Sequence, residues 1–238
     1  FHKKGIQWKM VRGGQFLMGS KKYKETRPVH SVSVKTFWIM KTEVTYKQYL
    51  ACANSGGCIP FFAKTVYDAR NHKVKSPMDS VSIREARLFC RWVGGRLPSE
   101  SEWEFAARSR GKNWKYPWGN SRPTCAKVNM RRKSPYFSRF CGSFAVCHTQ
   151  TGNTVQGLCD MNGSVSEFVG DCWHVNYEGK PNDGSSWKTN CRNSEYVIRG
   201  GNRMVFQMDY ADYDMSRRWG QIGRSMTTGF RCVRTASP

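Results

Sequence analysis

The sequence predicts an α+β fold that is rich in loops and braced by disulfides. Three observations support this prediction. Helices with clear capping signals occur in the first half, only short strand-like pieces separated by turns follow, and ten cysteines occur without any CxxC spacing. The 238 residues contain no Pro/Ser-rich linker and no internal repeat. We therefore expect residues 1–238 to form a single domain.

The first strands are predicted from apolar patterning and glycine turns. Residues 8–20 indicate a strand, a Gly-Gly turn and a second short strand. Residues 29–39 alternate apolar and polar side chains, which is typical of one further strand. Beyond residue 110 the helix signals end, and turn-rich pieces such as 116–120 predict a long irregular half with few short strands.

Three helices are predicted from their N-terminal caps. Thr45 is a good N-cap for a helix that carries Tyr46 and Tyr49 on one face. Ser82 and Glu85 form a capping box, and Ser99 with Glu102 repeats it. The apolar stripe of the second helix consists of Ile83, Ala86, Phe89, Cys90 and Val93.

The cysteine count indicates the compartment. Ten is an even number and no metal-ligand spacing occurs, so five disulfides in an oxidising environment are expected. The sequence starts at Phe1 without a signal peptide or membrane span, as in a processed or trimmed chain. We expect an exported protein, secreted or displayed at a bacterial surface, and attachment by a lipid anchor before processing is compatible with this.

A formal net charge of +22 favours anionic partners, although solubility alone explains it equally well. No block of five or more Lys or Arg and no nucleic-acid-binding motif is present, so specific nucleic-acid recognition is not expected.

Motifs along nearly the whole chain resemble the formylglycine-generating enzyme family, also called the sulfatase-modifying-factor domain, which has a C-type-lectin-like fold. The most specific is Phe89-Cys-Arg-Trp-Val-Gly-Gly-Arg-Leu-Pro-Ser-Glu-Ser-Glu-Trp-Glu-Phe-Ala-Ala-Arg108. The other matching stretches are 13–20, 25–30, 41–45, 116–120, 157–161, 197–201 and 229–232. The resemblance implies a disulfide between Cys90 and Cys232. Proximity suggests Cys52 with Cys58 and Cys172 with Cys191, and leaves Cys125, Cys141, Cys147 and Cys159 to pair locally.

The resemblance also predicts that this chain is not an enzyme. Oxidase members carry two copper-binding cysteines just after the Arg-Gly-Gly strand, and the matching positions here are Val205 and Tyr210. A thiolate cannot be replaced by either side chain. The five histidines lack metal-ligand spacing, and the extra domain of the related iron-dependent sulfoxide synthases is missing. Spacing does not exclude Ser/His/Asp catalysis, but no nucleophile elbow occurs.

No cofactor is expected, although the family can carry a structural calcium. The matching ligand positions are Asn129, Met130 and Glu167. Ser164 stands where the family has a ligand-type Asn.

The departures from the family pattern gather in residues 202–228. A chain whose family motifs are intact outside this one C-terminal segment resembles the variable proteins of diversity-generating retroelements, whose C-terminal codons are mutagenised at adenines. The aromatic, Arg and Asp residues of this segment are typical of a recognition surface. The predicted ligand-binding residues are Arg203, Val205, Phe206, Gln207, Asp209, Tyr210, Asp212, Tyr213, Asp214, Arg217, Trp219, Gln221 and Arg224.

The leading hypothesis is therefore a non-catalytic protein that binds a protein or glycan ligand on another cell or surface. The alternative is a formylglycine-generating-type oxidase or related enzyme. A weaker third hypothesis is electrostatic adhesion to anionic glycans, which would fall steeply with salt. Neither the ligand nor the oligomeric state follows from the sequence.

Overall fold

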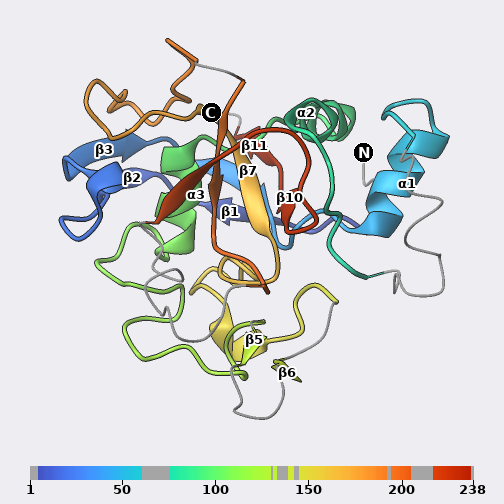
Figure 1. The fold of residues 1–238 in the computed structure, drawn as a ribbon, viewed down its shortest axis with the longest axis horizontal. Helices are drawn as coiled ribbons and strands as arrows, with labels where there is room; N and C mark the ends of the chain where they lie inside the picture. The colour runs from blue at the N-terminus through green and yellow to red at the C-terminus, as the bar shows by residue number, and fades with distance from the viewer. Residues whose placement is uncertain are drawn as a thin grey trace.

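The structure is a computed structural model of the chain (Figure 1). It describes residues 5–60, 75–129, 131–132, 139–141, 145–191, 194–204 and 217–236. Within these ranges no helix is long and apolar enough to cross a membrane.

Three helices and several small sheets are connected by long loops, as the sequence predicts. The strands are β1 (Trp8–Val11), β2 (Gly14–Met18), β3 (His30–Val34), β4 (Phe37–Met40), β5 (Arg131–Arg132), β6 (Arg139–Phe140), β7 (Ser166–Cys172), β8 (Tyr196–Arg199), β9 (Arg218–Gln221), β10 (Thr228–Phe230) and β11 (Val233–Thr235). The helices are α1 (Tyr46–Asn54), α2 (Ile83–Trp92) and α3 (Glu100–Ala107), with short 3₁₀ turns at Lys24–Thr26 and Gln150–Gly152.

The largest described sheet has the strand order β10-β7-β8-β9, which leaves β9 at one edge. A second sheet has the order β1-β4-β11 and joins the two ends of the chain. The pairs β2-β3 and β5-β6 complete the set. Among the described strands, β10 and β7 pair in parallel and the other pairs are antiparallel.

The single strand predicted over residues 29–39 is wrong, because the chain forms two strands there. β3 pairs with β2, and β4 pairs with β1 and β11. The break lies at Lys35 and Thr36, where the Thr36 hydroxyl accepts a hydrogen bond from the Gly13 amide at 3.0 Å. A Cβ on Gly13 would lie 2.4 Å from the Val34 carbonyl oxygen, so only glycine permits this approach.

The helix caps are present as predicted. Ser82 and Ser99 each accept a bond from the third amide of their helix, and Glu85 and Glu102 bond back to the cap amides. Thr45 forms a third capping box with Gln48, a partner that the sequence analysis did not identify. On α2, the side chains of Ala86, Phe89, Cys90 and Val93 are buried as expected.

Helix α3 lies at the centre of the molecule, and all eight of its residues are buried. It packs against β2 and β3 on one side and against β7 and β8 on the other (Figure 1). A polar helix in this position must find partners for its carboxylates inside the protein.

Five disulfides account for all ten cysteines. Cys90–Cys232 joins α2 to the segment between β10 and β11, across 142 residues of sequence. The pairs Cys52–Cys58 and Cys172–Cys191 are formed as proximity suggested. The remaining four cysteines pair as Cys125–Cys141 and Cys147–Cys159.

Candidate functional site

The predicted recognition segment starts where β8 ends. Gly200 and Gly201 follow β8 with φ angles of +95° and +65°, a conformation that favours glycine. A Cβ on Gly200 would approach the Trp103 ring to 3.0 Å, so this turn packs directly on α3. The segment resumes at Arg217 and continues through β9 and the turn to β10. Nine predicted site residues lie outside the described residues: Met130, Val205, Phe206, Gln207, Asp209, Tyr210, Asp212, Tyr213 and Asp214.

Two of the predicted ligand-binding arginines fasten the ends of this segment to the frame. Arg203 donates to Asp79 at 2.8 Å and to the Met226 carbonyl at 3.3 Å. Arg224 donates twice to Glu85, at 2.6 and 3.0 Å. Burial alone would raise the pKa of Glu85, but the bonds from Arg224 hold it below its usual value. Both arginines therefore act as anchors in this structure.

Arg217 lies between Trp219 and residues of the distant segment between β2 and β3. The Arg217 guanidinium lies 4.5 Å from the centre of the Tyr23 ring and 5.3 Å from that of Trp219. It also pairs with Glu25 at 2.9 Å. A cation held against two aromatic faces and a carboxylate has a fixed orientation. Neither Tyr23 nor Glu25 is among the site residues predicted from the sequence.

A second feature that the sequence analysis missed is an apolar set beside the two arginine anchors. Met204, Ile222 and Met226 are 43, 60 and 68% exposed. Methionine side chains adapt to partners of different shape, which suits a contact surface. These three residues alternate with charged and polar neighbours without helix or strand periodicity, so the sequence pattern does not reveal them as one set.

Beneath the segment lies a buried network of three acids and three bases, all with fully buried side chains. Glu100 is its centre, since one of its oxygens accepts from Arg199, Arg218 and Tyr177 at 2.8, 2.7 and 3.0 Å. Burial alone would raise the pKa of Glu100, but Arg218 and the other bases bring it far below its usual value. The remaining members are Glu104, Asp171 and Lys180.

This network places the first residue of β9 on α3. Arg218 also donates to the main-chain oxygens of Glu25 and His174, at 3.3 and 2.7 Å. Breaking such a network by deleting one charge costs several kcal/mol, so the position of β9 is firmly held. One signal in the sequence could have indicated the buried network. Glu100 and Glu104 are spaced i,i+4 on a helix whose other residues on that face are small or apolar.

The residues at the expected calcium positions are engaged with other groups. Both Glu167 oxygens accept bonds from Arg231 at 2.7 Å, and one also accepts from Trp103 at 3.0 Å. The Asn129 carbonyl accepts from the Ser164 amide at 3.0 Å. No group of three or more His, Cys, Asp or Glu with metal-binding geometry occurs among the described residues. These contacts give no support to the predicted calcium.

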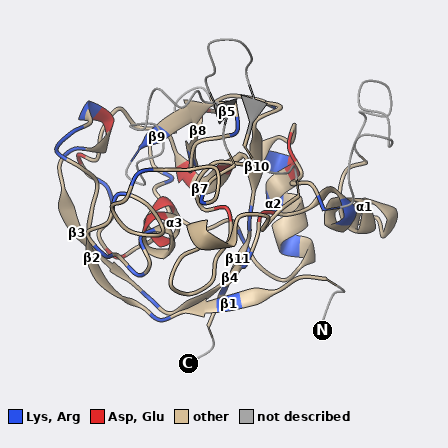
Figure 2. Ribbon diagram, turned by 90° about the horizontal axis from the view of Figure 1, so that it is seen from below, with Lys and Arg blue, Asp and Glu red and all other residues tan. Residues whose placement is uncertain are grey.

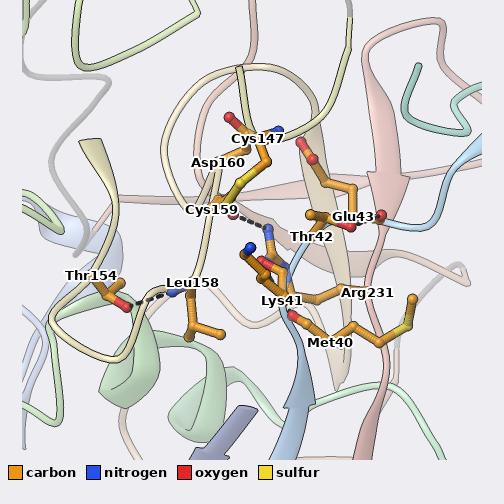
Figure 3. The surroundings of a disulfide bond; sticks show 10 residues. All are labelled: Met40, Lys41, Thr42, Glu43, Cys147, Thr154, Leu158, Cys159, Asp160 and Arg231. Carbon is orange, nitrogen blue, oxygen red and sulfur yellow. Dashed lines mark hydrogen bonds between the residues drawn. A yellow bond between two sulfur atoms is a disulfide. The ribbon is translucent and has the colours of Figure 1, made fainter. Parts of the chain in front are cut away.

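A buried pair of carboxyl groups lies beside the same arginine. Figure 3 shows Glu43, Asp160 and Arg231 grouped around the Cys147–Cys159 disulfide. Burial, together with the charge of Asp160, raises the pKa of Glu43 well above its usual value. Burial likewise raises the pKa of Asp160, although its carboxylate accepts a bond from the Cys147 amide. A proton on Glu43 fits this position, because a second buried negative charge beside Asp160 would be costly.

Comparison with known proteins reveals the family. A family model described as the sulfatase-modifying factor enzyme 1-like domain matches residues 4–236. The formylglycine-generating enzyme of Mus musculus is 26% identical over 177 residues, which cover 68% of this chain and 45% of that protein. The chain therefore spans less than half the length of this relative.

Two solved structures show the fold. PvdO from Pseudomonas aeruginosa superposes with a TM-score of 0.77 at 23% identity, covering 96% of this chain and 94% of that one. Treponema denticola variable protein 1 has a TM-score of 0.70 at 20% identity, covering 97 and 95%. The fold is thus the C-type-lectin-like fold expected from the motifs. Because the family model matches nearly the whole length, the chain belongs to the family of sulfatase-modifying factor enzyme 1-like domains.

Proposed function

We propose that this protein is a non-catalytic binding protein, a variable protein of the diversity-generating-retroelement type, exported to a bacterial surface. Its ligand would contact the surface built around residues 202–228, and the ligand would be a protein or a glycan on another cell or surface. The observation that carries the proposal is the state of the cysteines. All ten are in disulfides, so none supplies a thiolate for copper or for a substrate.

The frame around the segment supports a binding role. Arg218 and Arg224 pair with the buried Glu100 and Glu85, Arg203 pairs with the half-buried Asp79, and Cys90–Cys232 braces the strands beyond the segment. A rigid frame lowers the entropic cost of presenting contact residues, whatever the sequence between the anchors. The fold shared with Treponema denticola variable protein 1 is consistent with this use.

The alternative, an oxidase of the formylglycine-generating type, is favoured by the name of the Mus musculus relative. A turnover experiment decides between them. Purified protein is incubated with copper, oxygen and a Cys-containing peptide, and the peptide mass is followed. We expect no oxidised product, and formation of a formylglycine product would overturn the proposal.

The location of the binding surface is tested on glycan and protein arrays. Wild type is compared with a variant in which residues 202–227 are scrambled with Arg203, Arg218 and Arg224 kept in place, after circular dichroism has shown that both are folded. We expect the wild type to retain a ligand that the scrambled variant loses. Equal retention by both would place the binding surface elsewhere. A near-identical repeat of the coding segment for 196–236 beside a reverse transcriptase would independently support diversification.

A further inference from the structure

The binding surface extends beyond the C-terminal segment to the connection between β2 and β3. Tyr23 stacks on Arg217, Glu25 pairs with the same guanidinium, and the Glu25 carbonyl accepts from Arg218. Residues 23–25 therefore lie against the start of β9, although they are more than 190 positions away in sequence. Contacts with Arg217 and Arg218 hold this part of the surface in place.

The connection carries a concentrated positive charge. Lys21, Lys22, Lys24 and Arg27 are all exposed, and the single acid among residues 21–27, Glu25, is neutralised by Arg217. Figure 2, in which Lys and Arg are blue, shows blue stretches in the loop between β2 and β3. Lys22 lies 4.8 Å from the centre of the Tyr23 ring, so the charge is placed next to the aromatic contact. Such a patch attracts an acidic partner.

Among the described residues, the neighbouring strand β9 lies at the edge of its sheet. β9 pairs with β8 on one side and ends the strand order of its sheet. On its other side, no backbone hydrogen bond joins Trp219, Gly220 or Gln221 to another strand within the described ranges. Main-chain groups left in this way can pair with an extended segment of another chain.

We propose that the partner is an acidic polypeptide segment that binds in an extended conformation along the edge of β9, with its carboxylates against Lys21, Lys22 and Lys24. The inference rests on the proposed binding function and names the chemistry of the partner. An open strand edge favours a polypeptide over a glycan, because only a polypeptide supplies alternating amide donors and carbonyl acceptors at the strand spacing.

The probe is a fluorescent peptide of about ten residues in which Glu alternates with Val or Thr, a composition that favours extended structure. Two further peptides carry N-methyl groups on either the odd or the even amides. Since alternate amides of a strand face the same neighbour, only one of the two should lose binding, by about tenfold or more. Equal binding by all three peptides would reject pairing along β9.

The protein variants separate local from general electrostatics. K21S/K22S/K24S should weaken binding of the unmethylated peptide by about tenfold, whereas K47S/K75S/K115S, which removes three exposed lysines elsewhere, should change it by less than about twofold.

An equal loss in both variants, or no binding by the wild type, overturns the proposal. So does tighter binding of a heparin fragment together with insensitivity to methylation, which would indicate an anionic glycan. If the wild type retains a ligand on the arrays but does not bind the acidic peptide, this inference is refuted and the proposed binding function stands. If the protein oxidises the Cys-containing peptide with copper, the proposed function itself is refuted.

Discussion

The guanidinium of Arg231 binds both carboxylate oxygens of Glu167 at 2.7 Å, and neither side chain is more than 1% exposed. Arg231 also donates to the carbonyls of Met40, Lys41 and Cys159. The Arg231 side chain thus joins Glu167 on β7 to the end of β4 at Met40 and to Cys159 in the loop before β7. The contact holds together the strands on which the recognition segment is built.

Deleting Arg231 should destabilise the protein strongly. Arg231→Met leaves the buried Glu167 charge without its partner, and we expect a loss of about 3–5 kcal/mol in the free energy of unfolding. Arg96→Met is the matched control, because Arg96 pairs with Glu102 but is 48% exposed, and its loss should cost about 1 kcal/mol. Urea unfolding of the two variants measures the difference. An equal loss of unfolding free energy in the two variants would show that burial of the Arg231–Glu167 pair does not increase its contribution to stability.

Stability should depend on the protonation of Glu43. The pKa of Glu43 is raised in the folded state above its usual value, so the stability that the protonated carboxyl group contributes is fully present below that usual value. As pH rises toward the folded-state pKa, the unfolded chain releases the proton first and stability falls. Glu43→Gln should flatten this decline, and Glu178→Gln, at an exposed position, should not. Thermal unfolding measured from pH 4 to pH 8 checks this, and parallel curves for wild type and Glu43→Gln would contradict it.

The two confirmed disulfides of very different span should contribute unequally. Cys90–Cys232 closes 142 residues and Cys52–Cys58 closes six. Loop entropy predicts a cost of about 5 kcal/mol for removing the first and about 2 kcal/mol for the second. Double Cys→Ala variants compared by chemical unfolding provide the measurement. A larger loss for the short loop would show that local packing, and not chain entropy, governs these bonds.

Trp219 should contribute to ligand affinity. It is half-buried against Arg217 at the edge strand, and truncation of an aromatic contact of this kind costs about 1–2 kcal/mol of binding free energy. Trp219→Ala should therefore weaken binding of an array-identified ligand about tenfold. The control is Trp38→Ala, which removes an exposed tryptophan on β4, a strand of a different sheet. Unchanged affinity in Trp219→Ala would remove this residue from the predicted site.

The sequence by itself determined the helices, because capping and apolar spacing are local. Ser82 with Glu85 and Ser99 with Glu102 are separated by three residues, and their bonds form within one turn. The long motif at 89–108 and the cysteine count likewise determined the fold and the existence of a disulfide framework.

Only the tertiary structure decided which of the predicted binding residues act as anchors. Arg203 and Arg224 were predicted to bind ligand and Arg218 was not, yet each of the three is bound to an acid 118 or more positions away. The strand break at Lys35 and the packing of Tyr23 on Arg217 have the same origin. A local sequence pattern determines whether a segment tends to form a helix or a strand. The partner of a charged or aromatic side chain, in contrast, depends on which distant segments the fold brings together.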